Sequence, residues 1–261
     1  MNHLQTIITA SIAAGKEILK IYHTDFSVEY KEDESPLTMA DKNANEIIIS
    51  FLKDTGIPVL SEEGRSISYE ERKSWHQLWV VDPLDGTKEF VKRNDEFTVN
   101  IALVENHEPV MGVVYTPVLD VLYVGDKSLG AFKVEEASKK ANLMDELNDA
   151  NRLPVIKEKD YYGIVASRSH LNEETSQFIE EVKSAHTNVK IVSKGSSLKL
   201  CMVAEGTADI YPRFAPTMEW DTAAGDAVVR ASGGKVMIGK TDTNLQYNKS
   251  DLLNPWFIVK R

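Results

Sequence analysis

An apolar run that leads directly into two carboxylates is the feature that most constrains how this chain can fold. Residues 78–81 read Leu-Trp-Val-Val and residues 82–86 read Asp-Pro-Leu-Asp-Gly. A short apolar run bounded by turn residues predicts a buried strand. Because Pro83 cannot donate the next ladder hydrogen bond, we expect the strand to end there. The pattern therefore predicts that Asp82 and Asp85 point toward one site at one edge of a sheet.

Further acidic residues follow other predicted elements. Glu62 comes after a short apolar strand, so that it would share a sheet edge with Asp82 if the two strands are neighbours. Asp221 stands at the predicted start of a helix. Four such carboxylates repel one another unless cations lie between them. Oxygen ligands of this kind, with the Leu84 carbonyl as a neutral one, favour magnesium.

Taken singly, each of these residues also has an ordinary structural explanation. Asp, Pro and Gly are common turn residues, which would account for residues 82–86. Glu62 would then be a solvated acid beside Glu63 in a loop, and Asp221 would cap the helix that follows it. Taken alone, the structural explanation is favoured for Glu62 and Asp221, whereas the metal site is already favoured for Asp82 and Asp85. The three positions together favour the metal site further.

The remaining pattern predicts a layered α/β fold of the α+β type with two sheets. Residues 136–160 are polar and lack periodicity, so we expect a surface connection between an N-terminal α+β half (1–135) and a C-terminal α/β half (161–261). The expected helices cover residues 2–22, 40–53, 173–184, 197–204 and 221–231. The expected strands cover residues 58–60, 78–81, 98–105, 109–115, 121–124, 131–134, 163–166, 189–192, 209–211, 235–238 and 256–259.

Composition and motifs exclude several classes of protein. The net charge of −10 argues against binding to a nucleic acid polymer. The sequence contains neither a Gly-x-Ser-x-Gly elbow, nor a P-loop, nor a Gly-x-Gly-x-x-Gly fingerprint. Its histidines and single cysteine lack the spacing of zinc ligands.

The expected location of the protein is the cytoplasm. Cys201 is the only cysteine, so that no intramolecular disulfide forms, and we expect it to be a small buried helix residue. No segment approaches the ~20 apolar residues of a transmembrane helix. Peripheral contact with the cytoplasmic face of the inner membrane is left open, and no partner protein is predicted.

Three separated segments resemble the inositol monophosphatase superfamily of lithium-sensitive, magnesium-dependent phosphatases. They are residues 80–90, Glu62 before them and Trp220-Asp221 after them, and the resemblance covers nearly the whole chain. Within the superfamily the chain looks most like the 3′(2′),5′-bisphosphate nucleotidases. That likeness lies in residues 82–90, 93–94, 97–103, 167–170, 195–206, 211–214 and 219–225.

The resemblance implies alternating α-β-α-β-α layers and hydrolysis of adenosine 3′,5′-bisphosphate (PAP) to AMP and phosphate. It also implies action on the sulfated form, PAPS, and a role in sulfur assimilation. Two or three magnesium ions would be held by Glu62, Asp82, the Leu84 carbonyl, Asp85 and Asp221. The implied catalytic residues are Asp41, Thr87 and Glu62. The implied substrate contacts are Asp85, Gly86, Thr87, Ser167, His170, Gly195, Lys199 and Asp221.

Two other functions remain open at this point. A related phosphatase for inositol monophosphate or fructose 1,6-bisphosphate would need the same carboxylates, and residues 167–170 and 195–199 favour the nucleotide. A noncatalytic regulator could share the fold, but it would not need both Asp41 and Thr87. For single residues, an exposed helical Lys199, a solvated His170 and a helix-capping Asp41 are the alternatives.

Overall fold

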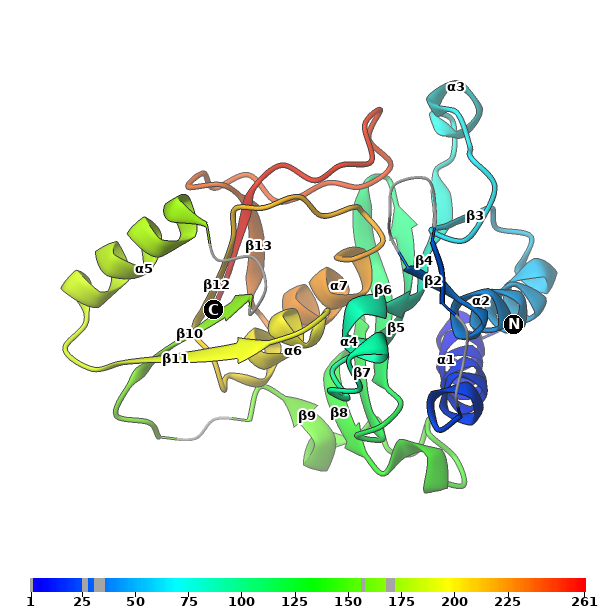
Figure 1. The fold of residues 1–261 in the computed structure, drawn as a ribbon, viewed down its shortest axis with the longest axis horizontal. Helices are drawn as coiled ribbons and strands as arrows, with labels where there is room; N and C mark the ends of the chain where they lie inside the picture. The colour runs from blue at the N-terminus through cyan, green and yellow to red at the C-terminus, as the bar shows by residue number, and fades with distance from the viewer. Residues whose placement is uncertain (1, 25–27, 31–35, 156–157, 168–171) are drawn as a thin grey trace.

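Helices and strands alternate along the chain and build two large sheets (Figure 1). The computed structural model describes residues 2–24, 28–30, 36–155, 158–167 and 172–261. The helices of this part are α1 His3–Tyr22, α2 Met39–Leu52, α3 Tyr69–Arg72, α4 Thr87–Val91, α5 Glu173–Ala185, α6 Leu198–Glu205 and α7 Ala223–Ala231, with 3-10 turns η1 Lys53–Thr55, η2 Ala137–Lys139 and η3 Asp149–Asn151.

The strands fall into three groups. A small pair consists of β1 Val28–Tyr30 and β2 Pro36–Thr38. The seven-stranded sheet contains, in spatial order, β3 Val59–Ser61, β4 Gln77–Asp85, β5 Thr98–Glu105, β6 Glu108–Thr116, β7 Val121–Asp126, β8 Gly130–Glu135 and β9 Arg152–Leu153. The five-stranded sheet contains, in spatial order, β11 Val189–Lys194, β10 Tyr162–Ser167, β12 Ile210–Arg213, β14 Phe257–Lys260 and β13 Lys235–Ile238.

The layers follow one another as the sequence predicted. In Figure 1, α1 and α2 cover one face of the seven-stranded sheet, and α6 and α7 lie between the two sheets. Helix α5 covers the outer face of the five-stranded sheet. In the seven-stranded sheet only β3 and β4 are parallel. The α-β-α-β-α arrangement with two sheets is therefore confirmed.

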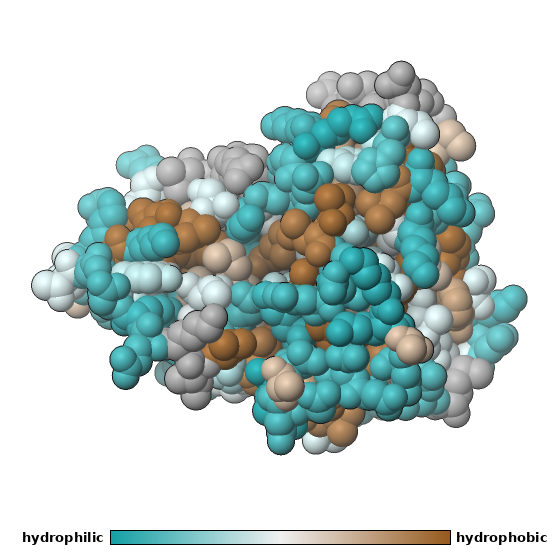
Figure 2. All heavy atoms as spheres, turned by 90° about the horizontal axis from the view of Figure 1, so that it is seen from below, coloured by the Kyte–Doolittle hydropathy of each residue, from teal (hydrophilic) through white to brown (hydrophobic). Residues whose placement is uncertain are grey.

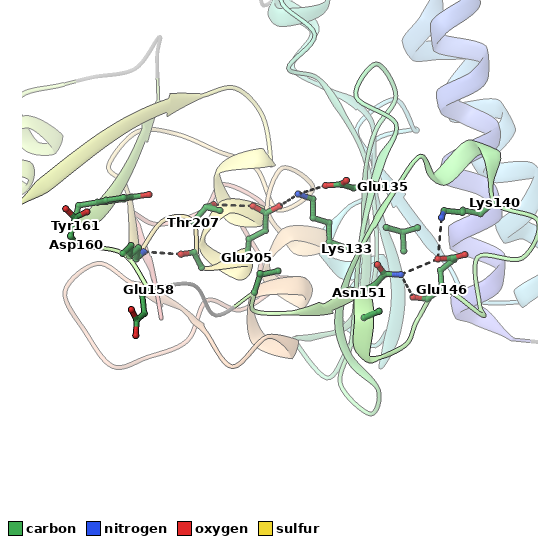
Figure 3. Close-up of a pocket in the computed structure, with 15 residues that line it drawn as sticks. Lys133, Glu135, Lys140, Glu146, Asn151, Glu158, Asp160, Tyr161, Glu205 and Thr207 are labelled. Carbon is green, nitrogen blue, oxygen red and sulfur yellow. Dashed lines mark hydrogen bonds and ion pairs between the residues drawn. The ribbon is translucent and has the colours of Figure 1, made fainter.

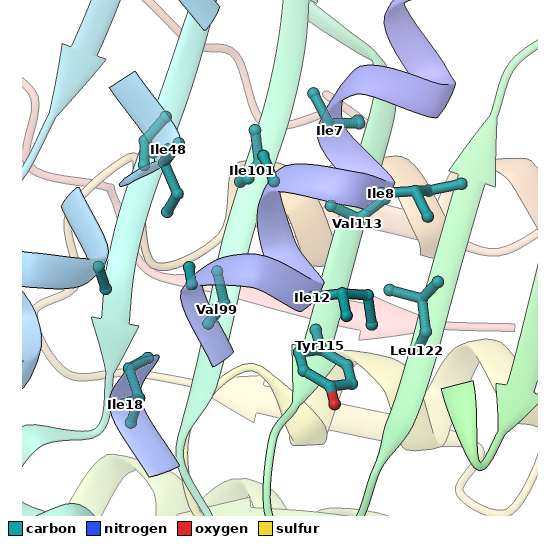
Figure 4. Packing of buried hydrophobic residues seen from close by; sticks show 14 of the residues in the cluster. Ile7, Ile8, Ile12, Ile18, Ile48, Val99, Ile101, Val113, Tyr115 and Leu122 are labelled. Atoms are coloured by element: carbon teal, nitrogen blue, oxygen red, sulfur yellow. The ribbon is translucent and has the colours of Figure 1, made fainter. Parts of the chain in front are cut away.

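The outer layer is held by the apolar face of α1. The helix begins at His3 because the Asn2 side chain accepts hydrogen bonds from the N–H groups of Leu4 and Gln5. Figure 4 shows its isoleucines lying against the sheet. The residues of this contact are Ile7, Ile8, Ile12 and Ile18 from α1, and Val99, Ile101, Val113 and Leu122 from β5, β6 and β7. Burial of each such side chain stabilises the fold by about 1.5–3 kcal/mol.

Glycines allow α7 to lie unusually close to the seven-stranded sheet. A Cβ atom at Gly125 would stand 2.5 Å from the Cα of Val228, and one at Gly112 would stand 2.7 Å from the Ala224 carbonyl oxygen. Any side chain at these positions would push the helix away. The close contact matters for the site, because α7 follows Asp221 directly in the chain.

Some elements differ from the expectations. Strand β4 continues through Pro83 to Asp85, because a register shift between Asp82 and Asp85 accommodates the proline. Pro83 therefore does not end the strand. The short helix α3 and the β1–β2 pair were not expected from the sequence. Residues 136–160 contain two 3-10 turns and supply β9, which pairs with β8.

Seen from below, the surface is mainly hydrophilic, with several hydrophobic patches (Figure 2). Among the described residues, no helix combines the length and apolarity that crossing a bilayer requires.

Candidate active site

Two neighbouring strands carry the first acidic residues to one sheet edge. Strands β3 and β4 are parallel, with Ser61 opposite Val81, and the N–H of Glu62 donates to the Val81 carbonyl at 3.1 Å. The two strands are therefore neighbours, which is the condition under which Glu62 and Asp82 share a sheet edge. Asp82 is 1 % exposed, and its Oδ1 accepts a hydrogen bond from the Leu84 N–H at 3.1 Å.

Asp221 reaches the same place from the other half of the chain. It lies in a turn before α7, where its Oδ2 accepts a hydrogen bond from the Met218 N–H at 2.9 Å. The N-cap residue of α7 is Thr222, so Asp221 does not cap the helix. Ligand atoms of Glu62, Asp82 and Asp221 all lie within 4.8 Å of one another. These three residues are called the acidic cluster below.

The electrostatics of the acidic cluster call for a cation. Burial, together with the neighbouring Glu62, Asp85, Asp221 and Asp41, raises the pKa of Asp82 far above its ordinary range. Burial and the charge of Asp85 raise the pKa of Asp221 to about 8. Ionised carboxylates held this way are costly unless positive charge compensates them. An all-oxygen set with this charge can hold a hard divalent cation, so the residues fit a metal site.

A threonine and an aspartate meet beside the acidic cluster. Asp41 lies buried in the first turn of α2, and Thr87 opens α4. The Thr87 hydroxyl lies 3.4 Å from Asp41 Oδ2 and 3.5 Å from the Leu84 carbonyl oxygen. The fold thus pairs two residues that stand far apart in the sequence. Gly86 makes this possible, since its φ of +95° is strained for other residues and a Cβ would stand 2.8 Å from the Ser196 hydroxyl.

A small cavity of about 110 Å³ adjoins the acidic cluster and carries cationic side chains. Its lining includes the carboxylates Asp85 and Asp221 and the cations Lys194, Lys199 and Arg213. Gly195 also lines it, where a Cβ would stand 2.9 Å from Glu89 Cγ. The cavity therefore presents both signs of charge to a ligand.

Lys199 is the most unusual of these cations. It is 6 % exposed, and its Nζ donates to the Ser196 carbonyl at 2.6 Å and lies over the Tyr211 ring. The alternative of an exposed helical lysine is therefore wrong. Burial lowers the pKa of Lys199 to about 8, although Asp85 opposes this shift. A buried ammonium group of this kind is well placed to pair with an anion.

Two of the predicted contacts are described in part or not at all. Ser167 ends β10, beside β11 and β12, but its side chain lies outside the described part. His170 lies outside the described residues. Three residues had no individual role in the sequence reasoning. Arg213 lines the cavity, while Ser197 and Asn100 contact Asp85 Oδ2 at 2.9 and 3.4 Å. Their only signal was that they belong to the segments that carry the resemblance.

A second and much larger opening lies elsewhere, which we call the groove. It has a volume of about 1060 Å³ and is lined by residues of β8, of 140–161 and of the end of α6 (Figure 3). Its lysines are already paired. Lys133 lies 2.7 Å from Glu205, and Lys159 lies 2.7 Å from Asp209. The groove lysines therefore already have acidic partners within the protein.

Comparison with known proteins shows which family the chain resembles over its length. The profile of the inositol monophosphatase family matches residues 2–256. The chain is 43 % identical over 263 residues to the 3′(2′),5′-bisphosphate nucleotidase CysQ of Salmonella typhimurium, covering 98 % of each chain. The crystal structure of CysQ from Bacteroides thetaiotaomicron superposes with a TM-score of 0.90 at 49 % identity, covering 99 % of this chain and 98 % of that one.

A more distant structure shares the fold alone. The IMPase of Thermotoga maritima is 23 % identical, with a TM-score of 0.74 and coverage of 100 % of this chain and 92 % of that one. The profile match and the identity to the CysQ proteins extend over nearly the full length, and the acidic cluster lies within that span. The chain belongs to the inositol monophosphatase family, whose members are metal-dependent phosphatases.

Proposed function

We propose that the protein hydrolyses the 3′-phosphate of PAP, giving AMP and phosphate, with magnesium as its metal. The observation that carries this proposal is one cavity whose lining includes Asp85 and Asp221 together with Lys199 and Arg213. A substrate with two phosphates would use both groups of residues, one phosphate at the metal and one at the cations. Relatives 43 % identical over nearly the whole chain carry the name of this activity.

The metal would be held by oxygen atoms of both halves of the chain. We assign Glu62, Asp82, the Leu84 carbonyl, Asp85 and Asp221 to two or three magnesium ions. Bound magnesium would supply positive charge against the phosphate and would lower the pKa of a nearby water. The raised pKa values of Asp82 and Asp221 support this assignment, because positive charge there returns both groups to their ionised form.

Thr87 and Asp41 would prepare the attacking water. In this geometry the Thr87 hydroxyl donates to Asp41 Oδ2, which leaves the threonine oxygen free to accept a proton from water. The threonine passes its own proton to the buried Asp41 carboxylate as it accepts the one from water, so that the water becomes hydroxide, Thr87 stays neutral and Asp41 becomes protonated. Glu62, at the adjoining strand end, would orient the same water.

The first half of the chain would hold the phosphate that is removed, and the second half would hold the departing nucleotide. N–H groups at Gly86 and Thr87, where α4 begins, would face the phosphate oxygens. Lys199 and Arg213 would bind the 5′-phosphate as charge-assisted donors. We place the nucleoside against Ser167, His170 and Gly195. The same contacts would accept PAPS, which would make the enzyme part of sulfur assimilation and nucleotide recycling.

The test is phosphate release from PAP and, separately, from inositol 1-phosphate. Each reaction is run with magnesium, with EDTA and with added lithium. Magnesium-dependent, lithium-sensitive release from PAP with little from inositol 1-phosphate supports the proposal. The opposite substrate preference would keep the metal chemistry and overturn the nucleotide, whereas release from neither would overturn hydrolysis altogether.

A further inference from the structure

Ser197 stands at the N-cap of α6 but does not cap the helix. A serine at this position usually accepts a hydrogen bond from an N–H group of the first turn. Here Ser197 has helical backbone angles, φ −69° and ψ −7°, and its side chain makes no such bond. Ser197 is 1 % exposed, so its hydroxyl needs another partner.

The hydroxyl finds its partners among the acidic residues of the site. Ser197 Oγ lies 2.9 Å from Asp85 Oδ2 and 2.9 Å from the carbonyl oxygen of Asp221. Asn100 Nδ2 donates to Ser197 Oγ at 2.9 Å, which leaves the serine proton for one of those two oxygens. A single hydroxyl thus joins β4, β5 and the turn before α7.

The contacts fix the orientation of the Asp85 carboxylate. Its Oδ2 lies within hydrogen-bonding distance of Ser197 Oγ at 2.9 Å, Asn100 Nδ2 at 3.4 Å and Thr98 Oγ1 at 3.4 Å. Its Oδ1 accepts no hydrogen bond from the described residues. One oxygen is therefore anchored to the protein, and the other remains for a ligand. Hydrogen bonds to the rear of a ligating carboxylate typically change metal affinity by about 10–100-fold when they are lost.

We propose that Ser197 is a positioning residue for the metal site. Its hydroxyl holds the Asp85 carboxylate and the Asp221 backbone in fixed positions relative to each other. The proposal rests on the proposed function, because it takes Asp85 as a ligand. Ser197 does not line the small cavity, so its hydroxyl acts through Asp85 and not on the substrate. Loss of the hydroxyl weakens magnesium binding and leaves the rate at saturating magnesium close to that of the unchanged enzyme.

The experiment is Ser197→Ala, with magnesium binding measured by titration calorimetry without substrate and kcat measured across a magnesium series. The expected result is about 10–100-fold weaker magnesium binding, with kcat at saturating magnesium within about threefold. Ser197→Thr keeps the hydroxyl and is expected to recover part of the affinity. Ser11→Ala is the matched control, because it also removes a buried hydroxyl, bonded only to Ile8 within α1.

Magnesium affinity of Ser197→Ala within twofold of the unchanged protein would overturn the proposal, and so would an equal loss in Ser11→Ala. If Ser197→Ala fails to fold, Thr98→Val tests the same anchor, since it removes another donor to Asp85 Oδ2 at nearly constant volume. It is expected to weaken binding in the same direction, and unchanged binding would count against the proposal. An unchanged protein that binds no magnesium would instead overturn the proposed function.

Discussion

The two ends of helix α6 open onto cavities of opposite character. Lys199 near its N-terminal end lines the small cavity beside the acidic cluster, and Glu205 and Gly206 at its C-terminal end line the groove. In the groove Lys133 pairs with Glu205, and Lys159 pairs with Asp209 and donates to the Gly206 carbonyl. Beside the small cavity, Asp82 and Asp221 are buried among other carboxylates, which raise the pKa of both.

The difference teaches that buried carboxylates facing one another, more than volume, mark the site. The groove is larger, about 1060 Å³ against about 110 Å³. A helix favours cations at its C-terminal end and anions at its N-terminal end. At the C-terminal end of α6, cations of the protein itself satisfy this preference. Lys159 donates to the Gly206 carbonyl and Arg261 donates to the Ala204 carbonyl. At the small cavity, the N-terminal end of α6 and Lys199 remain for an anionic ligand.

The largest effect is expected from Asp82→Asn. The exchange removes a buried ligand charge, so kcat on PAP should fall by about 10³-fold or more. The fold should survive. The folded-state pKa of Asp82 is raised, so the ionised carboxylate destabilises the metal-free protein at neutral pH, and asparagine removes that cost. The thermal midpoint without metal should therefore stay constant or rise.

Asp126→Asn is the control for Asp82→Asn. Asp126 is also buried, but it only accepts hydrogen bonds within the β7–β8 turn. The kcat of Asp126→Asn on PAP should be close to that of the unchanged enzyme. A near-normal rate in Asp82→Asn would show that the acidic cluster is not the catalytic centre, and the contrast with the groove would lose its meaning.

A smaller loss is expected from Lys199→Ala, and it should depend on the substrate. The kcat/KM for PAP should fall roughly 10- to 150-fold, as for a lost hydrogen bond to a charged group. The kcat/KM for 3′-AMP, which lacks the second phosphate, should change little. Steady-state kinetics with both substrates provide the measurement. Equal losses on both would show that Lys199 supports the site as a whole and does not bind the 5′-phosphate.

The pH dependence should reveal the same lysine. Burial lowers the pKa of Lys199 to about 8, so its positive charge is present below that pH and is lost above it. The ratio of kcat/KM for PAP to that for 3′-AMP should therefore fall as the pH rises through about 8, because kcat/KM reports groups of the free enzyme. In Lys199→Ala the ratio should be flat. A fall that persists in the variant would assign the titration to another group.

The smallest effect on activity is expected in the groove. Lys133→Met removes a partner of Glu205, whose side chain is 10 % exposed and also accepts from the Tyr123 hydroxyl. Because Lys133 is only partly buried, we expect a loss of about 1–2 kcal/mol in the free energy of unfolding. Magnesium-dependent turnover of PAP should stay within about twofold.

Urea unfolding and the PAP assay measure the two properties of Lys133→Met. A large loss of turnover with unchanged stability would mean that the groove takes part in function. In that case the charge argument that separates the two cavities would fail.

The sequence alone determined which chemical groups the protein has and where they lie along the chain. The apolar runs before Glu62 and Asp82 predicted two strands, and the strands pair as expected. Most helices and strands also lie where the periodicity placed them, because burial of one face requires that periodicity. The family follows from this same local information.

Only the tertiary structure decided which of these groups meet. Ser197 contacts Asp85 across 112 positions of the chain, and no pattern in the sequence indicated that contact. The burial of Lys199 was equally invisible, since a lysine in a short helix is usually exposed. The register shift that lets β4 pass through Pro83 depends on its pairing with β5. Local patterns record the period of burial along one element, whereas contacts between elements depend on how closely those elements pack.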